Sequence, residues 1–162
     1  MTWFISKFSI LFVVSIFQAV LADILLLYGL GLEVKNIGLF FLFSILTSLT
    51  FMAIVQFFVT TMADPGRFIA IIILILQLTT SAGTFPLELL PDVFQVINHW
   101  LPMTYSVAGL RAIISTGDFT EMWNQAYVLI GFFAMFIIGT IIYFSLKVKK
   151  SSVQEDVGQI EG

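Results

Sequence analysis

One carboxylate stands inside a long apolar stretch of this sequence. The stretch is FSILFVVSIFQAVLADILLLYGLGL, residues 8–32, and Asp23 is its only charged residue. A charged side chain in hydrocarbon is costly unless it faces protein or water. Asp23 is therefore interpreted either as a contact for a proton or a substrate, or as a structural partner of Tyr28, Arg111 or water.

Two glutamines flank the tight turn TMADPGR, residues 61–67. Gln56 precedes the turn and Gln77 follows it, at depths of about 8 and 14 Å on helices that must be neighbours. A hydrogen bond between the two helices, worth around 1 kcal/mol, is the expected contact of these side chains.

Small and hydroxyl side chains end the segment after that turn. The run is Thr79-Thr80-Ser81-Ala82-Gly83-Thr84. Leu or Phe would suit lipid better at these positions. The run therefore either packs tightly against a neighbouring helix or lines a wet vestibule, and Thr80 is the candidate residue within it.

Four polar side chains recur at helical steps in PLELLPDVFQVINHW, residues 86–100. They are Glu88, Asp92, Gln95 and His99. Such a stripe suits a metal or acid–base site, and it suits the solvated face of an amphipathic helix equally well. The solvated face is the favoured interpretation.

Most catalytic chemistry is missing from the sequence. The chain has no cysteine and one histidine, which excludes thiolate sites and multi-histidine metal centres. It has no G-x-x-x-x-G-K-[ST], H-E-x-x-H or G-x-S-x-G motif. We assign no catalytic, cofactor-binding or metal-binding residue, and we expect neither a cofactor nor an enzyme.

The composition places these residues in a membrane. Hydrophobic residues make up 59% of the 162 residues and charged residues 10%, whereas soluble domains carry about 25% charged residues. So few charges cannot cover a soluble globule, which argues against a soluble enzyme or a nucleic-acid-binding protein. The predicted fold class is an all-α integral membrane protein, with the lipid bilayer as its surroundings.

Charge-free intervals predict about four transmembrane helices, at residues 8–30, 38–61, 68–85 and 122–146. They form a single membrane domain, residues 1–150, and a polar, flexible cytoplasmic tail follows at 151–162. A signal peptide cut after Ala22 is the alternative for the first helix. The continuation ILLLYGLGL is as apolar as the residues before it, which favours the transmembrane helix.

Basic residues predict the orientation. Placing both termini and the 64–67 turn on one side of the membrane leaves only Lys35 and Arg111, of the seven basic residues, on the other. We therefore expect both termini in the cytoplasm and the segment between the last two spans outside.

Pro102 divides that external segment into a pair of short helices, at about residues 87–116. Thr104 or Ser106 is expected to cap the second helix, which ends near Gly117. Neither helix is long enough to cross a bilayer. The pair is therefore either re-entrant and packed against the bundle, or it lies on the outer surface.

The same segment resembles a known family. TFPLELLP, F-x-x-I-N and LPMTYSV-x-G-L-R follow one another between Gln77 and Phe119. In this order they resemble the C-terminal membrane region of the YhgE/Pip (phage infection protein) family, which is grouped with the type-2 ABC transporter permeases. A similar membrane region occurs in the accessory membrane protein of Gram-positive type VII secretion. The resemblance implies short re-entrant helices between the last two spans.

The resemblance also implies a function, a permease-like domain for export or secretion in the bacterial cytoplasmic membrane. Such a domain is expected to work as a homo-oligomer or membrane-complex subunit, with a separate ATPase subunit. The alternative is a non-transporting membrane anchor or a receptor module for phage adsorption. Gln77 and Thr80 are expected beneath an external lid shaped by Pro86, Pro91, Pro102, Tyr105, Gly109 and Arg111.

The chain also departs from the family pattern. Family members are longer and carry an additional membrane helix and an extracellular stalk. We therefore expect the chain to be a C-terminal fragment, a split gene product or a degenerate copy. Ala112 stands where an acidic residue commonly follows the arginine. Arg111 is therefore expected to have a different partner.

Overall fold

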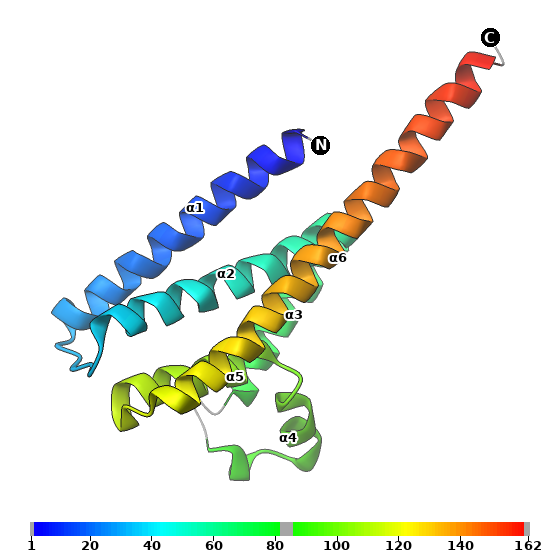
Figure 1. Cartoon of the computed structure of the whole chain (residues 1–162). Helices are drawn as coiled ribbons and strands as arrows, with labels where there is room; N and C mark the ends of the chain where they lie inside the picture. The colour runs from blue at the N-terminus through cyan, green and yellow to red at the C-terminus, as the bar shows by residue number, and fades with distance from the viewer. Residues whose placement is uncertain (1, 82–85, 161–162) are drawn as a thin grey trace.

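The computed structural model describes residues 2–81 and 86–160, and every regular element in these ranges is helical (Figure 1). This confirms the all-α fold predicted from the sequence. The elements in chain order are α1 (Thr2–Ile24), η1 (Leu25–Gly29), α2 (Ile37–Met62), α3 (Asp64–Thr80), η2 (Leu87–Leu89), α4 (Asp92–Asn98), α5 (Pro102–Arg111), η3 (Ala112–Thr116) and α6 (Phe119–Ile160).

Helix α2 is the centre of the bundle, since α1, α3, α5 and α6 all pack against it. Its first turn is capped by Asn36, whose side chain accepts a hydrogen bond from the backbone N–H of Leu39 at 3.2 Å. At its other end the backbone reverses at Ala63, with φ 53°, and α3 starts at the next residue. We call this the hairpin end of the bundle, and the opposite end, at the 30–36 loop, the loop end (Figure 1).

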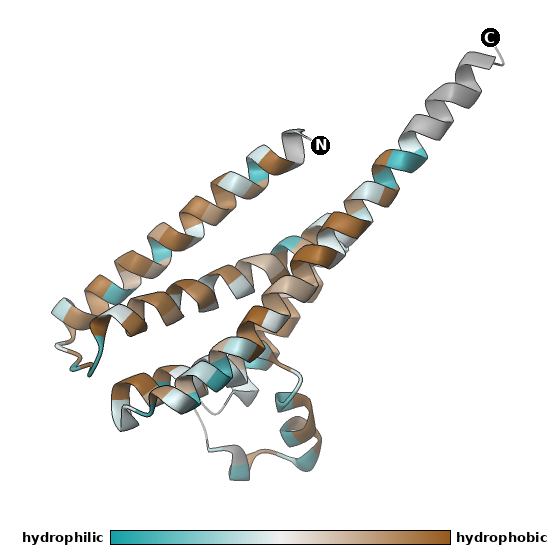
Figure 2. Ribbon diagram, in the orientation of Figure 1, coloured by the Kyte–Doolittle hydropathy of each residue, from teal (hydrophilic) through white to brown (hydrophobic). Residues whose placement is uncertain are grey.

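Three of the described helices are long and apolar enough to cross a membrane: Ile5–Gly29, Ile37–Met62 and Phe119–Ser151. They correspond to the first, second and fourth predicted spans. Figure 2 shows that apolar residues cover most of α1, α2 and the middle of α6, and that hydrophilic residues gather in the 30–36 loop. The exposed side chains of the spans include large apolar ones such as Val13, Phe17 and Ile141. These surfaces suit contact with lipid.

Helix α3 is shorter than the third predicted span. It has 17 residues, which is about 25 Å at roughly 1.5 Å per residue. It begins at the hairpin end, four residues before predicted, and ends at Thr80. Residues 82–85 of the predicted span 68–85 lie outside the described residues, so a fourth crossing stays a prediction.

Helix α6 continues beyond the predicted span. Its backbone is helical as far as Ile160, through most of the segment predicted to be a flexible tail. The last apolar residues of the predicted span are followed by Lys147, Lys149 and Lys150, which continue the same helix. Adding residues to a helix that is already nucleated costs less than starting one, and no proline interrupts this segment, so the sequence pattern does not mark that end.

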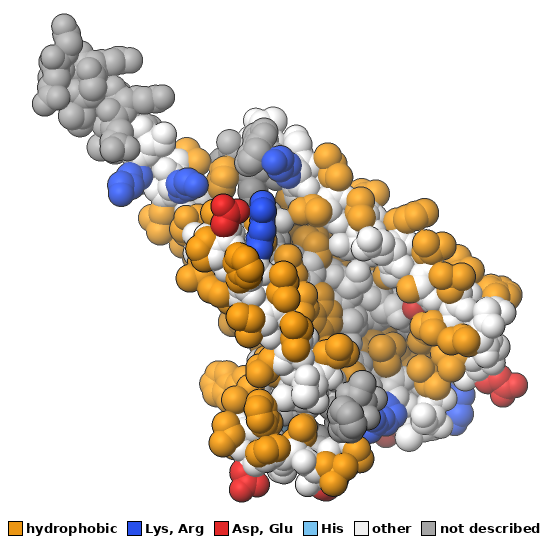
Figure 3. Space-filling view, turned by 180° about the vertical axis from the view of Figure 1, so that it is seen from behind, with side chains coloured by type: hydrophobic (Ala, Val, Ile, Leu, Met, Phe, Trp, Pro, Cys, Tyr) orange, Lys and Arg blue, Asp and Glu red, His pale blue; other side chains and the backbone are white. Residues whose placement is uncertain are grey.

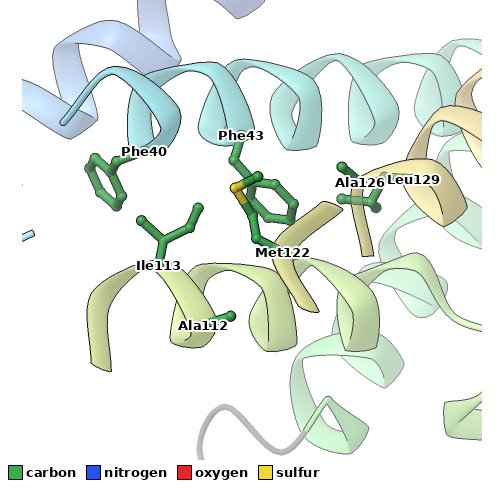
Figure 4. Packing of buried hydrophobic residues seen from close by; sticks show 7 residues of the cluster. All are labelled: Phe40, Phe43, Ala112, Ile113, Met122, Ala126 and Leu129. Atoms are coloured by element: carbon green, nitrogen blue, oxygen red, sulfur yellow. The ribbon is translucent and has the colours of Figure 1, made fainter. Parts of the chain in front are cut away.

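The hydrophobic core lies near the loop end, where α5 and η3 meet α2 and α6 (Figure 4). Its fully buried members are Phe40, Phe43, Ala112, Ile113, Met122, Ala126 and Leu129. η3 contributes Ile113 with no exposed surface. The second helix of the predicted pair, α5 with η3, is therefore packed against the bundle. This was one of the two arrangements expected from the sequence.

The external pair differs in detail from the prediction. α5 begins at Pro102, with Leu101 as its N-cap and no side-chain cap, so a cap from Thr104 or Ser106 was wrong. Proline supplies the helical φ at the first position by itself. The Thr104 hydroxyl donates instead to the backbone oxygen of Asn98 at 2.8 Å. The predicted end is confirmed, because η3 stops at Gly117 in the left-handed conformation, φ 66°.

Candidate functional site

A groove runs along the bundle between α1 and the helices α3 and α5, with α2 as its floor. Near the loop end it contains a cavity of about 290 Å³, and towards the hairpin end a second one of about 420 Å³. Gln18 and Ser48 line both cavities, so the two are adjacent. In Figure 3 the surface is hollowed between α1 and α3, and the hollow opens to the outside of the bundle.

Polar residues reach the groove because they recur on one face of α1. Ser15, Gln18 and Asp23 line its two cavities, and Ala19 and Ala22 stand between them on that face. Intervals of three or four residues place side chains on the same side of a helix. The remaining faces of α1 carry the large apolar side chains that suit lipid.

On α2 small hydroxyl residues line the groove near the loop end, and larger residues such as Phe51 and Met52 line it towards the hairpin end. Ser44, Thr47 and Ser48 face the cavity at the loop end. The Ser48 hydroxyl donates to the backbone oxygen of Ser15 at 3.0 Å, which ties α2 to α1. Small side chains allow this close approach of two membrane helices. They also leave room for the cavity next to the contact.

Of the described residues that line the two cavities, Asp23 alone is charged. Its side chain is buried, with 2% of its surface exposed. Ser44 of α2 lies beside the carboxyl group, and Oδ2 has no hydrogen-bond partner among the described residues. Tyr28, one of the partners considered from the sequence, is 84% exposed. The structural neighbour of Asp23 is therefore Ser44.

Gln56 and Gln77 do not form the interhelical hydrogen bond that the sequence suggested. Gln56 lines the groove and donates to the Thr60 hydroxyl of its own helix at 3.2 Å. Gln77 is 1% exposed, and neither atom of its amide group has a hydrogen-bond partner among the described residues. The expectation was wrong because Gln77 is 14 residues beyond the Ala63 turn and Gln56 only seven before it, an axial offset of about 10 Å.

The hydroxyl run at the end of α3 is buried where it is described. Thr80 has no exposed surface and donates to the backbone oxygen of Leu76 at 2.8 Å, and Ser81 is 2% exposed. Burial at both positions favours close packing over a wet vestibule. Ala82, Gly83 and Thr84 lie outside the described residues.

Gly109 lets α5 pack directly onto α2. A Cβ atom at this position would lie 2.7 and 2.8 Å from two ring atoms of Phe43, and closer still to a third. Tyr105, one turn earlier, packs its ring beside Phe132 of α6 and donates its hydroxyl to the backbone oxygen of His99 at 2.8 Å. These two residues of the predicted lid therefore hold α5 against the bundle. The next residue after Gly109, Leu110, lines the groove.

The other predicted lid residues lie further from the groove. Pro102 is buried at the start of α5, whereas Pro86 and Pro91 are exposed around η2 and α4. Arg111 is exposed at the last position of α5. The 30–36 loop contacts η3, because Lys35 Nζ donates a hydrogen bond to the backbone oxygen of Thr116 at 3.0 Å.

The acidic stripe between residues 88 and 99 does not form a metal site. Glu88 belongs to η2, and Asp92 and Gln95 belong to the separate helix α4. Among the described residues no group of three or more His, Asp or Glu side chains is placed to hold a metal ion. Glu88, Asp92 and His99 are all exposed, in agreement with a solvated face.

Comparison with known proteins agrees with this architecture. The family described as "ABC-2 family transporter protein" matches residues 1–142, which is most of the chain. The chain belongs to this family. The protein YhgE of Bacillus subtilis (strain 168) is 53% identical over 154 residues, which cover 95% of this chain and 20% of YhgE. The chain thus spans about a fifth of the length of that relative. No solved structure matches.

In this ABC-2 family domain, Asp23 and Gln56 of the groove were predictable from the sequence, but other polar residues of its lining were not. Gln18, Ser15 and Thr47 line the groove and were not singled out. A signal was present, because the polar and small residues of α1 from Ser15 to Asp23 recur at steps of three or four. The sequence could not show which helix α1 contacts, because the packing of α1 against the hydroxyl residues of α2 depends on the tertiary structure.

Proposed function

We propose that this ABC-2 family domain exports a polar or amphiphilic substrate across the bacterial cytoplasmic membrane, with the groove as its path. A polar group that crosses about 30 Å of hydrocarbon needs new hydrogen-bond partners in place of water. The groove offers carboxylate, amide and hydroxyl groups at Asp23, Gln18 and Ser48. These polar groups, which stand among apolar residues in the lining of the groove, carry the proposal.

Energy comes from a separate subunit in this proposal. The chain has no P-loop motif that could bind and hydrolyse a nucleotide. With both termini in the cytoplasm, the hairpin end faces the cytoplasm too, and an ATPase subunit docks there. The loop end faces outward, where α5 and η3 cover one side of the groove. A homo-oligomer, or a larger membrane complex, is the working unit.

The test is purification of the tagged protein from its own membrane in mild detergent, followed by an assay of ATP hydrolysis. We expect ATP hydrolysis to co-purify with the protein. Ser48→Phe, which fills the junction of the two cavities, is expected to change its rate at least twofold. Ile71→Phe is the matched control, because Ile71 is 54% exposed and lines neither cavity. No co-purifying hydrolysis, or equal effects of both variants, would refute the permease function.

A second candidate function is a membrane anchor or a receptor for phage adsorption. The observation that favours it is length, since the chain corresponds to about a fifth of YhgE. A membrane domain that makes up a fifth of a protein can anchor a much larger extracellular region to the membrane. Deletion of the gene separates the two functions. Phage resistance with unchanged composition of the exported material identifies the anchor, whereas accumulation of a compound inside the cell identifies the permease.

A further inference from the structure

We propose that the cavity at Asp23 binds a primary ammonium group, carried either by a lipid headgroup or by a small soluble amine. This assigns a substrate class to the groove, and it rests on the proposed export function for its physiological meaning. Binding itself is measured without ATP. The two proposals therefore succeed or fail separately.

The first argument is the charge of Asp23. A carboxylate buried from water is stable in its charged form only beside a cation or a full set of hydrogen-bond donors. Among the described residues Ser44 is a hydroxyl side chain beside the carboxyl group, and Oδ2 has no hydrogen-bond partner. The cavity beside it is lined by Gln18, Ala19, Ala22, Asp23, Ser44, Thr47, Ser48 and Leu110, none of which is basic. A ligand that brings its own positive charge completes this site.

The second argument is the size and lining of the cavity. Its volume of about 290 Å³ is much larger than the share of one water molecule, roughly 30 Å³. A bare metal ion would leave most of this space to water. An ammonium group on a short carbon chain fills more of it, because Ala19, Ala22 and Leu110 offer apolar contacts to the carbon atoms. The site is therefore shaped for an organic cation.

The third argument distinguishes primary from quaternary ammonium groups. A primary ammonium group has three N–H donors. Oxygen acceptors for them are present in the carboxylate of Asp23, the amide of Gln18 and the hydroxyl of Thr47. Quaternary ammonium groups donate no hydrogen bond and are recognised by aromatic cages. None of the described residues that line this cavity is aromatic, so the primary group is the better match.

The position of the cavity allows a lipid headgroup to reach it. Asp23 is six residues before Gly29, the last residue of the first span, a distance of about 9 Å along the helix axis. This depth is close to the membrane interface at the loop end. The hollow between α1 and α3 is open to the outside of the bundle (Figure 3), so a headgroup could enter sideways while its acyl chains stay in the bilayer.

The experiment measures the unfolding temperature of the purified full chain in a non-ionic detergent. Four probes are titrated: phosphatidylethanolamine and phosphatidylcholine with the same acyl chains, free ethanolamine, and tetramethylammonium. A ligand that binds the folded state raises the unfolding temperature with concentration, and its Kd follows from the shift. We expect a saturable rise with phosphatidylethanolamine, with ethanolamine, or with both, and no rise with the two quaternary probes. A rise with phosphatidylethanolamine alone identifies a lipid, and an equal rise with ethanolamine identifies a soluble amine.

Variants test whether Asp23 is the binding group. Asp23→Asn is expected to raise the Kd at least tenfold. Asp64→Asn is the matched control, because Asp64 is 84% exposed at the hairpin end, and it should leave the Kd unchanged. Gln18→Leu changes an exposed residue, so it is expected to fold even if Asp23→Asn does not, and it should raise the Kd about threefold.

Three results would overturn the inference. They are equal shifts with phosphatidylcholine and phosphatidylethanolamine, full binding retained by both Asp23→Asn and Gln18→Leu, or the same shift produced by sodium chloride at equal concentration. Any of them together with co-purifying ATP hydrolysis refutes the ammonium site and leaves the permease function standing. Selective amine binding without ATP hydrolysis supports the site and refutes the permease function.

Discussion

Gly109→Ala is the substitution that tests most sharply whether α5 packs on α2 as the structure shows. The added methyl group would lie 2.7 and 2.8 Å from ring atoms of Phe43, well inside van der Waals contact. The Phe43 ring is 2% exposed and sits in the core with Ile113 and Met122, so it cannot swing away freely. Overpacking of this kind costs about 1–3 kcal/mol. We expect a loss of that size in the free energy of unfolding.

The assay is thermal or denaturant unfolding in detergent, followed by circular dichroism. Gly131→Ala is the matched control, because a Cβ atom there has no neighbour within 4 Å. It should be neutral or slightly stabilising, since alanine favours a helix over glycine by roughly 0.5–1 kcal/mol.

A double-mutant cycle then assigns the effect to Phe43. In the Phe43→Ala background the ring is absent, so Gly109→Ala should cost about 1 kcal/mol or less, which leaves a coupling free energy within the range of about 0.5–3 kcal/mol seen for residues in contact. Equal costs of Gly109→Ala in both backgrounds would refute the packing of α5 on α2.

Three further predictions concern α3 and its turn. Gln77→Leu should raise the free energy of unfolding by about 1–3 kcal/mol, because it removes a buried amide group that has no hydrogen-bond partner among the described residues. A lower free energy of unfolding would show that the amide group of Gln77 does have a hydrogen-bond partner. Ala63→Gly should stabilise the protein by about 1 kcal/mol, since φ 53° suits glycine, and an unchanged unfolding midpoint would contradict this backbone conformation. Gly66→Ala should cost at least about 2 kcal/mol, because the new Cβ atom would overlap the backbone oxygen of Phe58; expression and a midpoint like those of the parent protein would refute the close α2–α3 hairpin.

The fold class and the long helices were predictable from the sequence because they depend on composition and on charge-free length. Three predicted spans coincide with helices that are long and apolar enough to cross a membrane. The ends of helices were less predictable. The polar residues after Lys150 continue α6, and Pro102 starts α5 without a side-chain cap. The fixed φ of proline decided the start of α5, whereas no local preference marks where α6 ends.

The candidate site was predictable only in part. Asp23 stood out as a lone charge in an apolar stretch, and Gly109 and Tyr105 stood out through the family motif. Their neighbours could not be read from the chain, because Ser44 and Phe43 come from α2 and their contacts depend on how the helices pack. The Gln56–Gln77 pair failed for the same reason, since adjacency of two helices does not fix which residues lie at the same depth.

The central claim is that the groove is a polar, water-accessible path, and cysteine labelling tests it most directly. The chain has no cysteine, so single-cysteine variants need no prior changes. Gln18→Cys lies in the groove, and Phe17→Cys is its control on the next residue of the same helix, 68% exposed and outside both cavities.

Each variant is reconstituted in lipid vesicles and treated with a membrane-impermeant thiol reagent, which reacts with the thiolate in water. We predict that Gln18→Cys reacts at least tenfold faster than Phe17→Cys, and that both react fully after denaturation. Equal protection of the two positions, or faster reaction of Phe17→Cys, would contradict a water-accessible groove.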